Sequence, residues 1–219
     1  MIVGCFWVTV GALIVGVPLG VACAVFLCEL TPPSVSIILR PTIQLLAAIP
    51  SVIYGFWGLI VLVPLIRNTL GGPGLSVLAG SLVLGIMILP TIISISEDSL
   101  RALPRTFKEG ALSLGATHWQ TIWRVLLPAS RSGIVASVIL GMGRAIGETM
   151  AMIMILGNAV QMPHSILDST RTLTTNIGIE MGYATGDHRQ ALFATGVVLF
   201  FIVMGLNTLA VFISGRRRA

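Results

Sequence analysis

Residues 2–28 contain no charged side chain. A helix crosses the hydrocarbon core of a bilayer with about 20 apolar residues, so this run is long enough to span a membrane. Only 10% of the whole chain is charged and 55% is hydrophobic, whereas a soluble domain carries roughly 25% charged residues. Helices satisfy their backbone polar groups internally, which lipid requires. The sequence therefore predicts an all-α, polytopic membrane protein.

Polar interruptions divide the chain into several apolar segments, which we treat as one transmembrane domain, residues 1–219. The expected spans are residues 2–28, 42–66, 75–96, 133–157 and 190–213. The second segment is interrupted at Ile49, Pro50 and Ser51. It also contains small residues, which allow neighbouring helices to approach closely.

Basic residues are distributed unequally between the loops. Loops 97–132 and 214–219 hold most of them, whereas loops 67–74 and 158–189 hold three arginines diluted by acidic residues. The positive-inside rule places the first pair of loops in the cytoplasm. The N-terminus then lies outside, so we expect a first transmembrane helix to be missing upstream. The net charge of +5 reflects this topology and does not indicate nucleic-acid binding.

Residues 104–128, PRTFKEGALSLGATHWQTIWRVLLP, form the longest polar interruption on the basic side of the chain. Thr106 and Glu109 have the spacing of a capping box, which predicts the start of a short helix over 107–114. Gly115 can adopt the left-handed conformation that ends such a helix. The stretch therefore begins with a short helix and a glycine turn.

A second short helix follows the glycine turn. Thr117 and Gln120 have capping-box spacing, and Pro128 is expected to end the helix. Four large apolar residues are expected to share one face of it: Trp119, Ile122, Trp123 and Leu126.

This stretch resembles the cytoplasmic coupling loop of ABC importer permeases, the EAA loop. The Glu-Ala-Ala triplet appears as Glu109, Gly110 and Ala111, followed by Gly115 and by VLLP at 125–128. Glycine at the middle position departs from the family and lowers helix propensity. The resemblance implies a type I, MetI-like helical bundle with a cytoplasmic coupling-helix pair. The alternative is an ordinary amphipathic hairpin at a membrane surface.

Four further stretches are similar to phosphate importer permeases of the PstC/PstA family. They are AAIPSVIYGFWGL (47–59), MILPTIISISEDSLRALP (87–104), GRAIGETMAMIMILGN (143–158) and DSTRTLTTNIGIEMG (168–182). The last stretch favours PstC over PstA. This resemblance, which covers about residues 8–210, implies a subunit that translocates inorganic phosphate across a bacterial or archaeal cell membrane.

The resemblance also implies which subunits the chain assembles with and which of them hydrolyses ATP. A PstA-like permease would complete the pathway, two PstB-like ATP-binding subunits would sit in the cytoplasm, and a PstS-like protein would deliver phosphate from outside. The chain lacks a Gly-x-x-x-x-Gly-Lys-Ser/Thr motif, so ATP hydrolysis is expected on the separate subunit. No cofactor and no catalytic residue is expected.

Arg144 and Glu148 are four residues apart inside an apolar segment, so on one helix they would share a face. A charge there costs roughly 2.5–3.5 kcal/mol on insertion scales, and such residues usually face the bundle interior and pair. One hypothesis is that Arg144 attracts the anion while Glu148 holds the guanidinium so that phosphate is released. The other is a structural ion pair that fixes helix packing.

The polar stretch 158–189 is too polar to span the membrane. It contains hydrogen-bonding side chains that could form part of an outer gate: Thr172, Thr174, Thr175 and Asn176. The alternative is a solvated surface loop with one short helix.

Other classes of function remain as alternatives. They are a permease for another oxyanion such as sulfate or molybdate, a PstA-type subunit, an intramembrane enzyme and a self-sufficient channel. No nucleophile–base constellation is visible within the spans. His118, His164 and His188 are widely separated, so no metal site is expected. The coupling-loop pattern argues against a channel, which needs no surface for a motor subunit.

Overall fold

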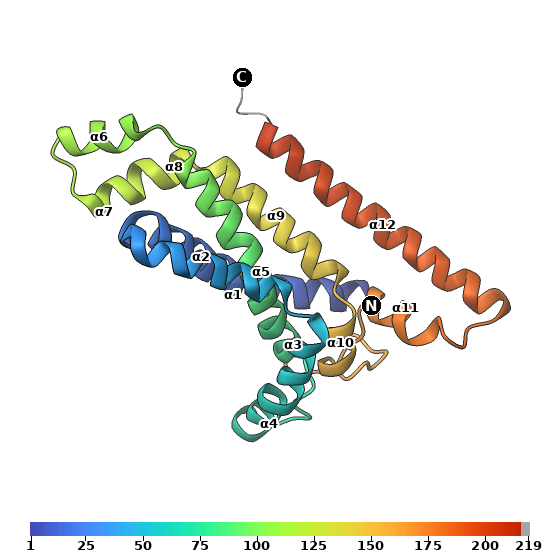
Figure 1. Cartoon of the computed structure of the whole chain (residues 1–219). Coiled ribbons are helices and arrows are strands. Elements are labelled where there is room, and N and C mark those ends of the chain that lie inside the picture. The colour runs from blue at the N-terminus through green and yellow to red at the C-terminus, as the bar shows by residue number, and fades with distance from the viewer. Residues whose placement is uncertain (216–219) are drawn as a thin grey trace.

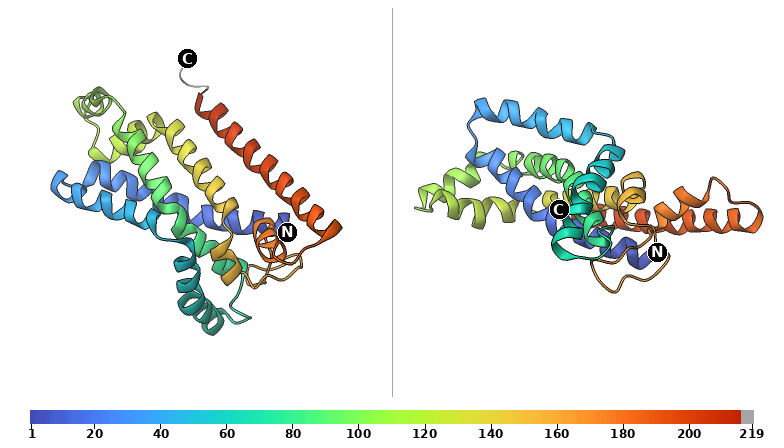
Figure 2. Two further views of the ribbon diagram at one scale, coloured as in Figure 1. Left: turned by 45° about the vertical axis from the view of Figure 1, so that its right-hand side comes forward. Right: turned by 90° about the horizontal axis from the view of Figure 1, so that it is seen from below.

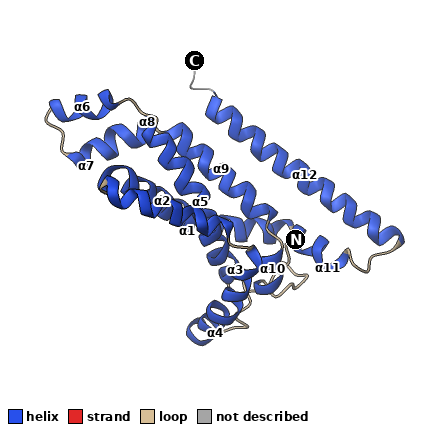
Figure 3. Ribbon diagram, in the orientation of Figure 1, coloured by secondary structure: helices blue, strands red, loops and turns tan. Residues whose placement is uncertain are grey.

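The computed structural model describes residues 1–215, and within them it contains helices and loops but no β-strand (Figures 1 and 3). In chain order the helices are α1 (Ile2–Val25), α2 (Pro33–Ala48), α3 (Ser51–Trp57), α4 (Val63–Leu70), α5 (Val77–Arg101), α6 (Arg105–Ser113), α7 (His118–Thr121), α8 (Leu127–Ala129), α9 (Arg131–Gly147), α10 (Met150–Ile155), α11 (Leu173–Glu180) and α12 (Gly186–Gly215). Single π-helical turns continue α1, α3 and α7: η1 (Phe26–Leu30), η2 (Gly58–Leu62) and η3 (Ile122–Leu126). The terminal arginines used in the topology argument, Arg216, Arg217 and Arg218, lie outside the described residues.

Four helical stretches of the described chain are long and apolar enough to cross a membrane. They are Ile2–Leu30, Ser51–Leu70, Val77–Arg101 and Gly186–Thr208. A further pair, His118–Ala129 and Arg131–Gly147, is bent by 68° at a short break. If that pair counts as one span, the described residues contain up to five.

Two of the expected segments are not single helices. The segment expected over 42–66 is divided at Pro50, because α2 ends at Ala48 and a new helix begins at Ser51. Proline lacks the N–H that would continue the helix, and it disfavours the helical conformation of the preceding residue. Ile49 is accordingly extended, with φ −64° and ψ 127°. The segment expected over 133–157 is likewise divided, since α9 ends at Gly147.

Helices α1, α5 and α9 pack together at the centre of the molecule (Figure 1). Small residues allow α1 to lie close to α5. A Cβ atom at Gly16 would lie 2.8 Å from Ile88 Cδ1, and one at Gly20 would lie 2.7 Å from Ile92 Cγ2. The Ser81 hydroxyl donates a hydrogen bond to the Val8 carbonyl at 3.2 Å. In lipid, where helix association depends on such close packing, this seam positions α5.

The main apolar core lies on α5 and is continued by α1, α3, α4 and α10. Its fully buried members are Ala12, Ala79, Val83, Ile88, Ile92, Ala151, Ile155 and Leu156. A second, smaller cluster lies where α1 and α5 end, and it includes Ala24, Val25, Leu100, Ile122 and Leu126. The second cluster joins the short helices of residues 104–128 to the central bundle.

The two ends of the bundle carry different elements. Helices α6 and α7 and the C-terminal end of α12 lie at one end, and α4, α10 and α11 lie at the other (Figures 1 and 2). Helix α12 packs against α9 and α11 at the edge of the bundle, and only 6% of its apolar window is buried. Most of α12 is therefore available to lipid or to another subunit.

Candidate functional site

The first short helix of residues 104–128 begins differently from the prediction. Helix α6 starts at Arg105 with Pro104 as its N-cap, and no side chain caps it. The predicted capping box of Thr106 and Glu109 is therefore wrong. Pro104 already sets an extended N-cap, with φ −57° and ψ 138°, so Thr106 falls inside the first turn. A capping side chain must precede that turn.

The turn between the two short helices agrees with the prediction. Gly115 has φ +84°, the left-handed conformation that glycine adopts without strain. The predicted second capping box is confirmed. Thr117 Oγ1 accepts a hydrogen bond from the Gln120 N–H at 3.2 Å, and Gln120 Oε1 accepts one from the Thr117 N–H at 2.9 Å.

The second short helix has two faces rather than the single apolar face expected. Ile122 and Leu126 are 1% and 4% exposed and belong to the second core cluster, whereas Trp119 and Trp123 are 59% and 57% exposed. The two indoles contact each other edge to face, with ring centroids 5.8 Å apart. Pro128 does not end the helix either, because it lies in the first turn of α8 and the break follows at Ser130.

The residues of the Glu-Ala-Ala-like triplet lie on the surface of α6. Glu109, Gly110 and Gly115 are exposed and Ala111 is half-buried. No atom lies within 4 Å of a Cβ built on Gly110 or on Gly115. Leu114, between them, is 90% exposed. The helix pair thus buries one side against the bundle and presents the other, partly apolar, side outward.

A buried carboxylate lies where α5 approaches these short helices. The Glu97 side chain is 6% exposed, and its Oε1 accepts hydrogen bonds from Arg40 Nε at 2.7 Å and Arg101 Nε at 3.1 Å. Close by, Lys108 on α6 forms an ion pair with Glu29 at 2.6 Å. Glu97 was not among the site residues predicted from the sequence, and its partners were missed. The only local signal was the spacing of four between Glu97 and Arg101.

Arg144 and Glu148 do not share a helix face. Helix α9 ends at Gly147, and Glu148 is extended, with φ −69° and ψ 131°. Glu148 Oε1 instead accepts a hydrogen bond from the Ala151 N–H at 3.1 Å. No ion pair joins Glu148 to Arg144 or to any other side chain in the described part of the chain. The expected pairing is therefore wrong, and the exposed Arg144 has no ion-pair partner among the described residues.

The polar residues of 172–176 are folded inward instead of forming a solvated loop. The side chains of Thr172, Thr174, Thr175 and Asn176 are all buried. Thr172 caps α11, accepting a hydrogen bond from the Thr175 N–H at 3.2 Å. The Thr174 hydroxyl donates to the Glu148 carbonyl at 2.8 Å. Glu148, Thr172 and Thr174 also line one small pocket, so the structure brings the two predicted groups together.

The loop before α11 covers the start of α5. Val77 N–H donates to the Asp168 carbonyl at 3.0 Å, and Leu78 N–H donates to the Ile166 carbonyl at 2.8 Å. These bonds satisfy donors that a helix leaves free in its first turn. The Asp168 side chain accepts from the N–H groups of His164 and Ser165, both at 2.8 Å, and these bonds lower the pKa of its carboxyl. This loop is therefore ordered against the bundle.

An arginine–carboxylate pair holds α11 to this loop. Arg171 Nη1 donates to Glu180 Oε1 at 2.8 Å and to Asn176 Oδ1 at 3.1 Å. Arg171 Nε donates to the Asn158 carbonyl at 3.1 Å. The guanidinium of Arg171 is the main reason that the pKa of Glu180 lies below its ordinary value.

Acidification is expected to loosen α11. A carboxylate with a lowered pKa stabilises the folded state above its unfolded pKa, about 4.3, and this contribution is lost as the pH falls through the lowered value. Hydrogen exchange over residues 171–180, corrected for intrinsic rates, should therefore show protection decreasing below about pH 4. The Glu180→Gln variant should lose this dependence, while Asp168→Asn should keep it. Equal pH dependence in Glu180→Gln would contradict the assignment.

Within residues 1–215 no group of three or more His, Cys, Asp or Glu is arranged to hold a metal ion.

A family model described as "Binding-protein-dependent transport system inner membrane component" matches residues 16–218. The chain belongs to this family. It is therefore a multi-pass protein of the cell membrane and a permease component of a binding-protein-dependent transport system.

Relatives from several bacteria align with almost the whole chain. A probable ABC transporter permease protein, YqgH of Bacillus subtilis, is 44% identical over 99% of this chain and 71% of its own length. The phosphate transport system permease protein PstC of Pasteurella multocida is 37% identical over 92% of this chain and 69% of its own length. PstC of Haemophilus influenzae is 40% identical over 87% and 67%.

Solved structures share the fold at low sequence identity. An inward-facing MetNI methionine ABC transporter chain is 22% identical, with a TM-score of 0.68, over 97% of this chain and 90% of its own. A chain of an amino acid ABC transporter is 17% identical, with a TM-score of 0.65, over 98% and 91%. The predicted MetI-like bundle is confirmed.

Proposed function

We propose that this permease carries inorganic phosphate into the cell as the PstC-like subunit of an ATP-driven importer. The observation that carries the proposal is the similarity to phosphate transport permeases named PstC, 37% and 40% identical over most of the chain. Four separate stretches of the sequence, residues 47–59, 87–104, 143–158 and 168–182, also resemble permeases of this family. A PstA-like identity or another oxyanion, such as sulfate or molybdate, is the second candidate.

The proposed assembly contains four further components of three kinds. A PstA-like permease completes the pathway, two PstB-like subunits hydrolyse ATP in the cytoplasm, and a PstS-like protein delivers phosphate from outside. The largely exposed helix α12 supports a second permease, since only 6% of its apolar window is buried within this chain. ATP hydrolysis is assigned to the PstB-like subunits.

The helix pair of residues 105–129 is the proposed docking surface for one ATP-binding subunit. Glu109, Gly110 and Ala111 lie on α6, and Gly115 forms the turn that orients α7. The pair is joined to the bundle by the buried Ile122 and Leu126. When its outward side is pushed, the helix pair can therefore move as a rigid body and displace α1 and α5, which share that cluster.

The proposed phosphate pathway includes Arg144 and Glu148. Arg144 supplies positive charge that is not neutralised by an ion pair within the described residues. Glu148 lies at the break between α9 and α10, where unwound backbone is tolerated beside a cavity. Thr172, Thr175 and Asn176 belong to the proposed outer gate, together with Thr174, because α11 contacts Glu148 through Thr174.

Reconstitution of the complete complex in proteoliposomes tests the substrate. The expected result is ATP-dependent uptake of labelled phosphate that excess sulfate or molybdate does not reduce. Uptake of sulfate or molybdate in preference to phosphate would favour the second candidate. Solute flux through the purified chain without ATP-binding subunits would contradict the importer mechanism and support a channel.

Replacing Gly115 by valine is expected to weaken ATPase docking. A side chain at φ +84° is strained by roughly 1–2 kcal/mol, which corresponds to a factor of roughly 5–30 in an equilibrium. Co-purification of the ATP-binding subunit and phosphate-stimulated ATP hydrolysis should both fall by such a factor. Gly72→Val is the matched control, because Gly72 has φ +76° and no atom near a built Cβ, and it lies in the turn between α4 and α5, away from the docking surface. Normal docking of Gly115→Val would argue against this surface.

A further inference from the structure

Helix α2 is attached to the bundle by polar contacts. Apart from Pro33, whose side chain is not described, none of its apolar side chains is buried, and Ser36 is its one buried residue. Ile37, Ile38 and Leu45 are 71%, 69% and 67% exposed. A helix usually takes its position from an apolar stripe packed on a core. The position of α2 is instead set by a few charged and polar side chains.

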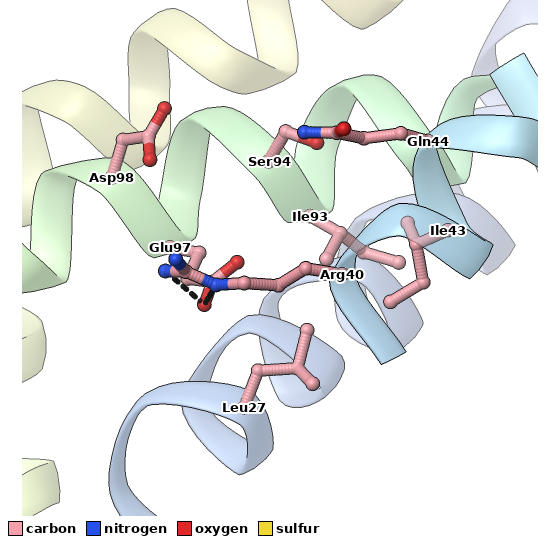
Figure 4. Close-up of a pocket in the computed structure, with 8 residues that line it drawn as sticks. All are labelled: Leu27, Arg40, Ile43, Gln44, Ile93, Ser94, Glu97 and Asp98. Carbon is pink, nitrogen blue, oxygen red and sulfur yellow. Dashed lines mark hydrogen bonds and ion pairs between the residues drawn. The ribbon is translucent and has the colours of Figure 1, made fainter. Parts of the chain in front are cut away.

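The central contact is made by Glu97 of α5. Its Oε1 atom accepts from Arg40 through Nε at 2.7 Å and Nη2 at 2.6 Å, as Figure 4 shows. The same oxygen accepts from Arg101 through Nε at 3.1 Å and Nη2 at 3.0 Å. One carboxylate therefore binds a guanidinium from α2 and another from its own helix, four residues before α5 ends at Arg101.

Arg101 extends this contact to the first turns of α2 and to the turn that precedes α2. Its Nη2 lies 3.3 Å from the Ser36 hydroxyl and 3.5 Å from the Leu27 carbonyl. A second ion pair binds helix α6 to the same turn, because Lys108 Nζ lies 2.6 Å from Glu29 Oε2. Helix α6, which is part of the proposed docking surface, and helix α5, which precedes it, are thus both bound to the α1–α2 region by charged side chains.

The C-terminal end of α2 is joined to α3 through a break in the helix at Ile49 and Pro50. Ile49 and Pro50 are both extended, and the Tyr54 hydroxyl donates to the Leu46 carbonyl across them at 2.8 Å. Beyond the break, Gly55 and Gly58 pack α3 tightly on α10 and α5. Helix α2 is therefore held at two points. Its C-terminal end is joined to α3, which packs on the core and begins at Ser51, and its middle is bound by the ion pair of Arg40 with Glu97.

We propose that Glu97 is a positioning residue that transmits movement of the docking helix to α2. This inference rests on the proposed function. When an ATP-binding subunit displaces α6, the ends of α5 and α6 move together, and the Glu97–Arg40 pair carries α2 with them. The break at Ile49–Pro50 accommodates the displacement. The Glu97–Arg40 contact is suited to this role, because the Glu97 carboxylate is buried and its short charge-assisted hydrogen bonds to Arg40 resist separation of α2 from α5.

The decisive variant is Arg40→Gln in the complete reconstituted complex. It removes the direct contact between Glu97 and α2, while Glu97 keeps Arg101, so the buried carboxylate remains paired and the fold is retained. The expected result is ATP hydrolysis close to the wild-type rate, with phosphate transported per ATP hydrolysed reduced roughly tenfold. Glu97→Gln should have the same effect, and the double variant should be no worse than either single one.

Asp98→Asn is the matched control. Asp98 is exposed and points away from the Glu97–Arg40 pair in Figure 4, so removing its charge should leave the ratio unchanged. A wild-type ratio in Arg40→Gln would overturn the role of Glu97, as would additive losses in the double variant. A wild-type complex that moves no phosphate would overturn the proposed function and this inference with it, so the two failures are distinguishable.

Discussion

Arg144→Gln is expected to reduce phosphate uptake by the assembled transporter roughly 10- to 100-fold. The estimate follows from a hydrogen bond to a charged group, worth about 1.5–3 kcal/mol, with about 1.4 kcal/mol per factor of ten. Arg144 is exposed in the last turn of α9. An ionisable side chain within an apolar membrane segment is costly, and it usually faces a cavity or another subunit. Its charge is thus available to a passing oxyanion.

The control for Arg144 separates charge from shape. Arg144→Lys keeps the positive charge but loses the planar fork, so it should retain more uptake than Arg144→Gln. ATPase docking should be normal in both variants, because residues 105–129 are unchanged. Normal uptake and normal phosphate affinity in Arg144→Gln would remove Arg144 from the pathway.

Gly55→Leu is expected to destabilise the folded chain more than any other single change considered. A Cβ atom at Gly55 would lie 2.8 Å from the Ala151 Cα atom and 3.0 Å from Met154 Sδ. Backbone cannot rotate away, so α3 and α10 must separate. Overpacking of this kind costs typically 1–3 kcal/mol, occasionally more. The thermal midpoint of the detergent-purified chain should fall, and α10 and its neighbour Glu148 should lose protection from hydrogen exchange.

Gly205→Leu provides the comparison for Gly55→Leu. Both glycines lie in apolar helices, but no atom lies within 4 Å of a Cβ built on Gly205. The same substitution there should leave the thermal midpoint of the isolated chain unchanged or raised, because leucine favours the helix over glycine. Equal destabilisation by the two variants would show that added bulk in a span, and not the contact with Ala151, is responsible.

Features that depend on a single turn of chain could be predicted from the sequence. The left-handed Gly115 and the capping box at Thr117 were predicted correctly, because each depends on residues within three positions. The capping box at Thr106 was wrong for an equally local reason, since the preceding Pro104 already begins the helix. Pro104 and the Thr106–Glu109 spacing both signal a helix start, and only the backbone conformation at Pro104 shows which of them begins the helix.

The pairing of charged residues could not be predicted by spacing. Arg144 and Glu148 have helical spacing, yet the helix ends between them. Arg40 and Glu97 are 57 residues apart and form the closest charged contact of α5 with α2. Spacing predicts a pair only when the helix is continuous, and the sequence alone did not show the break at Gly147.

Hydropathy and short turn signals act over neighbouring residues, so the amino-acid order alone was enough to predict a helical membrane protein, and the resemblance of its motifs pointed to the importer-permease family. The tertiary structure alone decided which polar groups are buried together. Glu97 reaches Arg40 only after α2 has packed on α5, and Thr174 reaches the Glu148 carbonyl only after α11 has packed beside the break between α9 and α10. In a membrane an isolated polar group is costly, so packing that supplies a partner determines where each one lies.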